Sequence, residues 1–159
     1  MKQLVILFFL ALTGCNDSPT GPMTGTNISG TWGITYTEWQ GSGITCYTSK
    51  IVNDITQSDS SFTGAASSPF TFSCTEGTTL LISNFTAAVI TNGKINGSGI
   101  SFDWANPAAH QSGIIFNDSM SGSSTLTLVN GVQFSNGAIT IPGGASLCSV
   151  TGQFNGKKQ

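Results

Sequence analysis

The chain has 159 residues, of which 8% are charged and 38% are hydrophobic, and its formal net charge is −2. All five basic residues are lysines, so the chain lacks the positive surface that dominates affinity for nucleic acid, and we expect no nucleic-acid partner. Disordered chains combine low hydrophobicity with high net charge, the opposite of this composition. The length therefore predicts one folded domain with a hydrophobic core.

The first fifteen residues predict where the protein is sent. Lys2 supplies a positive charge, and residues 4–12 form an apolar run of the length found in secretory signals. That run is too short to cross a bilayer, which takes about 20 residues. It ends in Leu12-Thr13-Gly14-Cys15, which resembles the lipobox of bacterial lipoproteins. The resemblance implies that residues 1–14 are a removed signal peptide and that the Cys15 sulfur carries palmitate or a similar acyl chain.

Two further expectations follow for a lipoprotein of this kind. Residues 15–29 are rich in Pro, Gly and small polar side chains and predict a lipidated, flexible tether, leaving residues 30–159 as one domain. In enteric bacteria an Asp after the acylated cysteine retains lipoproteins in the inner membrane. Asn16 stands there in this chain, so the resemblance favours an outer-membrane anchor in the cell envelope.

Residues 30–159 read as strands joined by turns, in which Val, Ile and aromatic side chains alternate with Gly, Ser, Thr and Asn. In 31–39, Trp32, Ile34 and Tyr36 share one face, and Trp39 falls on the other. Strands over 46–57 and 61–74 follow, and then two strands over 79–91 and 94–104 that meet at Asn92-Gly93. Strands over 112–116, 119–129, 132–141 and 147–154 complete the chain, with the strongest hairpin signal at Asn130-Gly131.

This pattern predicts an all-β fold. Strands with one polar face and short turns pair antiparallel with one face buried, and the absence of crossover helices argues against parallel pairing. Closing the sheet removes its exposed edges. We therefore expect an up-and-down meander that closes, or nearly closes, into a barrel of eight or nine strands. A two-sheet sandwich is the alternative.

The start of the first strand carries a second resemblance. Gly30-Thr31-Trp32 resembles the Gly-x-Trp start of lipocalins and avidin-type barrels, where the tryptophan plugs the closed end. In lipocalins a basic residue of the last strand packs over that tryptophan, and Lys157 is its nearest counterpart here. The resemblance implies a structural role for Trp32 and Lys157 and a barrel architecture. It implies no particular activity, because fold alone does not fix function.

Three cysteines remain after Cys15. An oxidising envelope favours one disulfide and one free thiol. Cys46 and Cys74 would face each other across a hairpin centred near residues 59–60, although simple alternation puts them on different faces unless a bulge near Pro69 shifts one strand. The pairing among the three cysteines stays open, and Cys148 shares its alternation with apolar neighbours, which predicts burial.

The residues that could support catalysis or metal binding are sparse. His110 is the single histidine, and we expect it in a solvated loop. A catalytic triad would have to use it, and a zinc site needs more ligands than one histidine and scattered cysteines supply. A glycosidase would need two of the domain's carboxylates, most of which fall at expected turns and strand ends: Glu38, Asp54, Asp59, Glu76, Asp103 and Asp118. We expect no metal, no cofactor and no enzymatic activity.

The large aromatic side chains leave two interpretations of function. If they fill the barrel, the protein is a structural or interaction lipoprotein that works through its surface. If Tyr47 and Trp104 instead line an open mouth, the barrel binds a small apolar molecule or a sugar. An envelope hydrolase with a carboxylate pair is a third and weaker interpretation.

Overall fold

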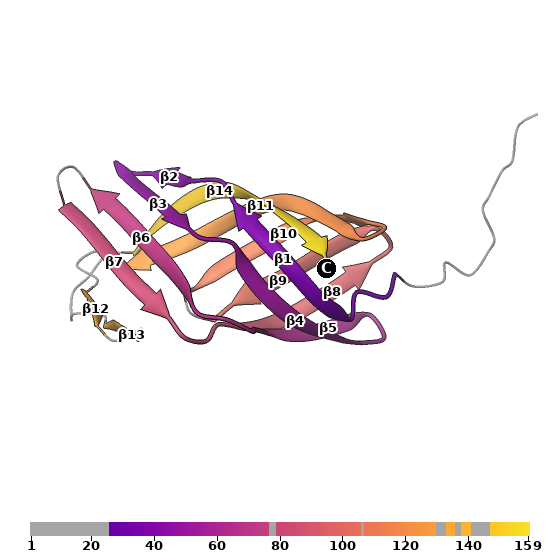
Figure 1. The fold of residues 1–159 in the computed structure, drawn as a ribbon. Helices are drawn as coiled ribbons and strands as arrows, with labels where there is room; N and C mark the ends of the chain where they lie inside the picture. The colour runs from indigo at the N-terminus through magenta and orange to yellow at the C-terminus, as the bar shows by residue number, and fades with distance from the viewer. Residues whose placement is uncertain (1–25, 77–78, 106, 130–132, 136–137, 141–146) are drawn as a thin grey trace, which may run out of the picture.

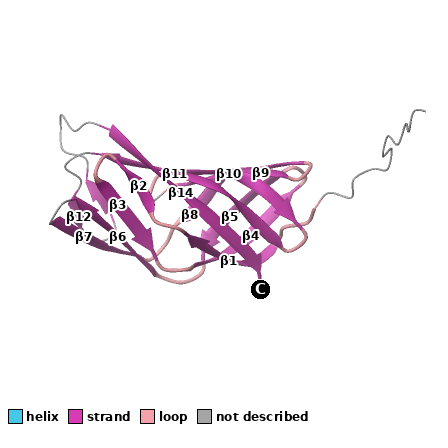
Figure 2. Cartoon of the chain, turned by 90° about the horizontal axis from the view of Figure 1, so that it is seen from above, coloured by secondary structure: helices cyan, strands magenta, loops and turns pink. Residues whose placement is uncertain are grey.

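The computed structural model describes residues 26–159 except 77–78, 106, 130–132, 136–137 and 141–146. That part of the chain contains no helix, and hence none that could cross a membrane (Figure 2). Its strands are β1 (Gly30–Tyr36), β2 (Trp39–Gly41), β3 (Ile44–Thr48), β4 (Ile51–Ser58), β5 (Ser61–Ala66), β6 (Phe70–Glu76), β7 (Thr79–Phe85), β8 (Val89–Asn96), β9 (Gly99–Trp104), β10 (Ala109–Phe116), β11 (Ser119–Val129), β12 (Gln133–Ser135), β13 (Ala138–Thr140) and β14 (Leu147–Lys158).

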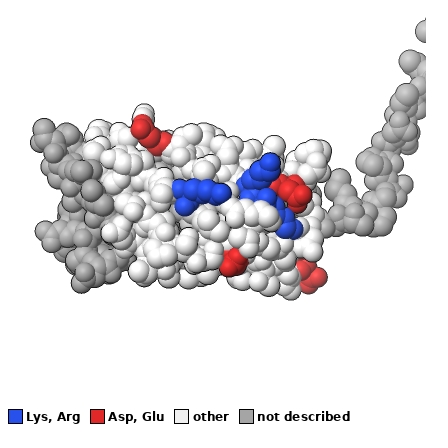
Figure 3. All heavy atoms as spheres, viewed as in Figure 1, with Lys and Arg blue, Asp and Glu red and all other residues white. Residues whose placement is uncertain are grey.

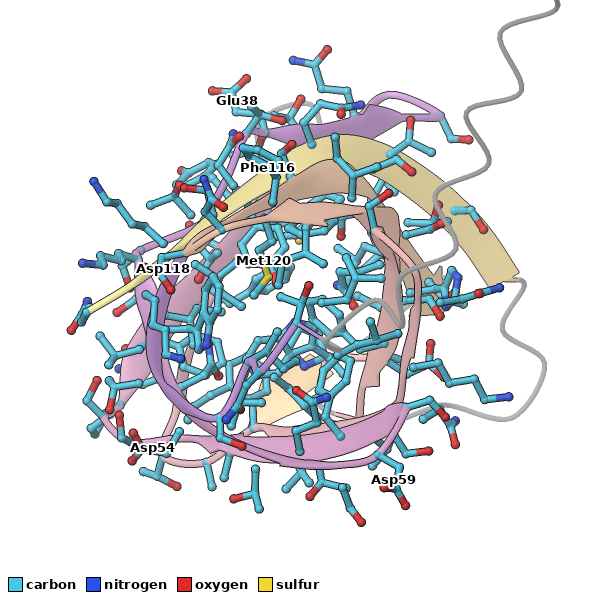
Figure 4. The ribbon with its side chains drawn as sticks, turned by 90° about the vertical axis from the view of Figure 1, so that its right-hand side faces the viewer. Glu38, Asp54, Asp59, Phe116, Asp118 and Met120 are labelled. Carbon is cyan, nitrogen blue, oxygen red and sulfur yellow. A yellow bond between two sulfur atoms is a disulfide. The ribbon has the colours of Figure 1, made fainter. Side chains whose placement is uncertain are left out.

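Eight of these strands close into an antiparallel barrel, which confirms the expected fold. Their order around the barrel is β1, β4, β5, β8, β9, β10, β11 and β14, and β14 pairs back with β1. The ring of strands is visible end-on in Figure 4. The barrel strands follow one another in chain order, so the barrel is a meander that the chain leaves and rejoins.

The remaining strands of the main sheet form an extension beyond the barrel. The chain leaves the barrel for β2 and β3 after β1, and for β6 and β7 after β5. β2 joins the barrel through β14, and the order β2, β3, β6, β7 then continues the sheet outward. Figure 1 shows this extension at the opposite end of the molecule from the first described residues. β12 and β13 form a separate hairpin.

Three tight hairpins share one end of the barrel. They join β4 to β5, β8 to β9 and β10 to β11, each by two residues. Asp59, Gly97 and Asn117 adopt positive φ in these turns, the conformation that Asn, Asp and Gly accept most readily. β1 begins and β14 ends here as well, because Trp32 pairs with Lys158. We call this the hairpin end.

Three of the expected strands are wrong in the same way. Residues 46–57, 61–74 and 79–91 are each divided between two strands, β3 with β4, β5 with β6, and β7 with β8. Each break lets the chain change direction and resets the alternation. Cys46 and Cys74 therefore meet across β3 and β6 rather than across one hairpin. They are directly paired, both buried, and joined by a disulfide.

A break also separates β1 from β2, and it changes the expected position of Trp39. β1 ends at Tyr36, and Trp39 opens the short strand β2. Its side chain is buried rather than on the outer face. The alternation of residues 31–39 thus holds only as far as β1 extends.

The turn expected at Asn92-Gly93 is a bulge inside β8. The register of β8 shifts between Thr91 and Lys94, and Asn92 adopts positive φ there. A Cβ on Gly93 would lie 2.6 Å from the ring of Phe62, so the bulge brings bare backbone against a core aromatic. The actual turn follows at Gly97. The hairpin expected at Asn130-Gly131 lies outside the described residues, as does the side chain of Cys148.

The folded part of the chain starts before the expected boundary at residue 30. Ile28 is completely buried. Its backbone N–H donates to Gln57 Oε1 at 2.7 Å, and the backbone N–H of Gln57 donates to the Ser29 hydroxyl at 3.0 Å. The expected tether is therefore shorter at its C-terminal end, and Cys15 lies outside the described residues.

Candidate functional site

Trp32 closes the hairpin end of the barrel. Its side chain is fully buried, and its indole N–H donates to the Ile28 carbonyl at 2.7 Å. The residues before β1 thus cover the hairpin end of the barrel and are held there by the hydrogen bond from Trp32. We call this covering segment, with Trp32, the plug. This is the structural position that the Gly-x-Trp resemblance implied for Trp32.

The basic residue beside this tryptophan is Lys158 rather than Lys157. Lys157 pairs with Gly33 and is exposed on the outer wall, so it does not cover Trp32. Lys158 pairs directly with Trp32, is half-buried, and donates from Nζ to the Asn27 carbonyl at 3.3 Å. The expectation was wrong by one residue, and one residue reverses the face of a strand.

Aromatic side chains fill the barrel from the hairpin end to the extension. Neighbouring ring centroids along this column are 4.7 to 6.3 Å apart, in the order Phe62, Phe102, Phe154, Tyr36, Trp39 and Phe72. A glycine leaves room for one of these rings, since a Cβ on Gly122 would lie 2.9 Å from the Phe154 ring. The column is continuous packing of the kind found in protein cores.

Three polar side chains inside the barrel, those of Trp39, Ser124 and Gln111, are hydrogen-bonded to one another. The Trp39 indole N–H donates to Ser124 Oγ at 2.9 Å. Gln111, also buried, accepts from that hydroxyl at 3.2 Å when its amide nitrogen is turned toward the Phe102 and Ala109 carbonyls. These bonds offset the cost of burying polar side chains and fix the orientation of Trp39.

The partly buried Tyr36 and the buried Trp104 form a second hydrogen-bonded pair. The Trp104 indole N–H donates to the Tyr36 hydroxyl at 2.7 Å. Burial raises the pKa of the Tyr36 phenol well above its usual value. The cavity that both side chains line has a volume of only about 10 Å³, at the lower limit for one water molecule.

The expected ligand-lining pair is not brought together. Trp104 points into the barrel and is buried, whereas Tyr47 lies on β3 beyond the barrel and is exposed. Tyr47 follows the buried Cys46, so alternation turns it to the outside. The prediction that Tyr47 lines a barrel mouth is therefore wrong.

His110 lies on β10 rather than in the expected loop. Its Nδ1 is 2.6 Å from Asp103 Oδ1 on β9, and the Asn92 amide donates to Asp103 Oδ2 at 2.8 Å. These hydrogen bonds, from Asn92 first and His110 second, lower the pKa of the Asp103 carboxyl. The three residues form a cross-strand polar cluster on the outer wall. No group of three or more potential metal ligands occurs among the described residues.

The outer wall near the hairpin end carries a feature that the sequence did not reveal. An open depression of about 610 Å³ lies over β10, β11, β14 and β1, and we call it the outer depression. Ile114 and Phe116 border it on one side and Lys50 and Lys157 on the other. Figure 3 shows lysine side chains on the face that carries β1, with acidic side chains beside those nearest the hairpin end.

Comparisons of the chain with models of protein families, with curated proteins and with solved structures find no match. The site is therefore interpreted from its own residues. The barrel interior offers tightly packed side chains, and the outer wall offers the polar cluster and the outer depression.

Proposed function

We propose that this chain is a lipid-anchored cell-envelope protein of bacteria with a non-catalytic structural or interaction role, which it performs through its outer surface. The observation that carries this choice over a ligand-binding barrel is the continuous aromatic column. A barrel that stores a small molecule needs a cavity of several hundred Å³, whereas the cavity beside Trp104 holds about 10 Å³.

The anchor itself is proposed from the sequence. An apolar run ending in Leu12-Thr13-Gly14-Cys15 supports acylation of Cys15 and loss of residues 1–14. Asn16 supports sorting to the outer membrane. The first described residues lead into the plug at the hairpin end, so an anchored chain would enter the barrel there.

The decisive experiment replaces Cys15 by Ser and follows the protein in a bacterial host. We expect the wild type to incorporate labelled palmitate and to sediment with membranes, because two or more acyl chains hold a protein stably on a bilayer. Cys15→Ser should lose the label and the membrane association. Ser18→Ala, just outside the lipobox, is the matched control and should keep both.

Sorting has its own test in an enteric host. Asn16→Asp should move the protein from outer-membrane to inner-membrane fractions of a density gradient while its palmitate label stays. A Cys15→Ser protein that still carries palmitate would contradict the anchor. Wild type found only with inner-membrane markers would contradict the sorting and leave the anchor intact.

A further inference from the structure

Two large apolar side chains stand exposed beside the hairpin end. Ile114 is 59% exposed and Phe116 is 73% exposed, the highest values among the large hydrophobic residues of the described chain. They share the outer face of β10, two residues apart, whereas Ile115 between them points into the core. Neighbouring exposed apolar side chains often mark a surface that contacts a partner or a membrane.

The strands beside β10 place lysines across the outer depression from these side chains. Phe116 pairs with Ser119, Ser119 with Lys157, and Lys157 with Gly33, and directly paired residues share a face of the sheet. The side chain of Lys50 lies over Gly33, where a Cβ would clash with it. The outer depression thus has an apolar side, a cationic side and a floor of small residues. None of the described residues that line it is acidic.

The start of the described chain lies at this same end. Lys158 donates from its backbone N–H to the Asp118 carbonyl in the β10–β11 turn and from Nζ to Asn27. The step from Cys15 to Thr26 is 26 − 15 = 11 residues, which span at most about 40 Å when fully extended. An acyl group on Cys15 would therefore keep the hairpin end, and with it the outer depression, within reach of the bilayer.

We infer that the outer depression rests on the lipid surface of the anchoring membrane, with Phe116 and Ile114 in the interface and Lys50 and Lys157 on anionic headgroup phosphates. This inference rests on the proposed lipid anchor. Its role is to orient the barrel, because the acyl chains already supply attachment. Aromatic rings prefer the interface, and lysines near an anionic leaflet are attracted to it.

The acidic residues are distributed unevenly around the barrel. In the end-on view of Figure 4, Asp54 and Asp59 lie on the far side of the barrel from Phe116, whereas Asp118 lies at the edge of the outer depression, between its lining residues Asn117 and Ser119. Glu38 lies on the same side as Phe116 but beyond the end of β1 that is opposite the hairpin end. A barrel that rests on the outer depression brings the lysines to the phosphates and turns Asp54 and Asp59 away from the bilayer, while Asp118 stays at the edge of the depression.

The test uses purified, acylated full-length protein reconstituted into vesicles of phosphatidylcholine and phosphatidylglycerol with brominated acyl chains, which quench nearby tryptophan. We expect Phe116→Trp to add emission, above the wild-type background, that brominated lipid quenches. Tyr47→Trp is the matched control, because Tyr47 is also exposed and lies on the extension. Its added emission should stay unquenched.

The lysines are tested in the Phe116→Trp background. Lys50→Gln with Lys157→Gln should lower the ratio of docked to undocked barrel by roughly 25-fold, at about fivefold for each lysine. Quenching should be lost while the protein still sediments with the vesicles. Vesicles of phosphatidylcholine alone should have the same effect on quenching.

Several outcomes would overturn the inference. One is unquenched Phe116→Trp emission from an acylated protein that sediments with the vesicles, which leaves the proposed anchor standing. Another is equal quenching of both tryptophan variants. A third is Phe116→Trp emission that changes with protein concentration without vesicles, since the depression would then bind a second copy of the chain. If wild-type protein purified from the bacterial host carries no acyl groups and does not sediment with the vesicles, both the anchor and the docking proposals are overturned.

Discussion

Replacing Trp32 by Ala should destabilise the barrel more than almost any other single change. The indole is fully buried, and its loss removes packing and leaves a cavity, which costs about 3–5 kcal/mol. The Ile28 carbonyl also loses its donor, so we expect about 4–6 kcal/mol in total. Domains of this size have about 5–15 kcal/mol of stability. The thermal midpoint should fall by roughly 15–25 °C.

Equilibrium denaturation in guanidinium chloride, followed by circular dichroism, measures this loss. Trp32→Phe keeps an aromatic ring but loses the N–H donor and part of the buried ring volume, so it should cost less than Trp32→Ala. Trp39→Ala should also be severe, because Trp39 is buried against Tyr36. Tyr47→Ala, at an exposed site, should stay within about 0.5 kcal/mol of wild type. If Trp32→Ala lowered the free energy of unfolding no more than Tyr47→Ala does, the assignment of Trp32 to the plug would be wrong.

Three other predictions concern the disulfide and two titrating groups. Replacing Cys46 and Cys74 together by Ala should lower the free energy of unfolding by roughly 2–4 kcal/mol, because their bond spans 28 residues of sequence; an unchanged denaturation midpoint would contradict this. Burial raises the Tyr36 pKa, so the contribution of Tyr36 to stability should be complete below about pH 10 and decline above it as the unfolded phenol ionises. Absorbance at 295 nm should show Tyr36 ionising only as the protein unfolds. Tyr36→Phe should remove that part of the alkaline destabilisation. The Asp103 pKa is lowered, so its contribution should be present above about pH 4 and be lost as the pH falls further; Asp103→Asn should flatten the acid limb of a stability-against-pH curve, and a limb identical to wild type would refute this.

Local patterns in the sequence predict some features of the fold. Alternating apolar and polar residues without helical periodicity predict antiparallel strands with one buried face. That pattern correctly predicts the all-β class and the closed barrel. Trp32 was assigned correctly because it lies inside an uninterrupted strand, where alternation alone fixes the face. The proposed signal peptide and lipobox rest on the sequence alone, since such targeting signals are linear.

Other features depended on where the strands break. Alternation predicts a face only relative to its own strand, and a break or a bulge resets it. Trp39 was misassigned because the chain leaves the barrel between β1 and β4. The pairing of Cys46 with Cys74 was proposed but stayed open, because the chain leaves the barrel again after β5 and alternation does not continue across either break. His110 was placed in a loop because Pro107 and the small residues around it obscure the start of β10. One residue of register also decided between Lys157 and Lys158.

The outer depression was decided by tertiary structure alone. Phe116, Lys157 and Lys50 are far apart in the sequence, and they become neighbours only because β14 pairs with both β11 and β1. Locally, Ile114-Ile115-Phe116 is an apolar triplet that does not reveal which members face outward. The sequence by itself determined the strand-forming chemistry and the proposed anchor. Closure of the barrel decided which side chains meet, because contacts between distant strands depend on register and not on local preference.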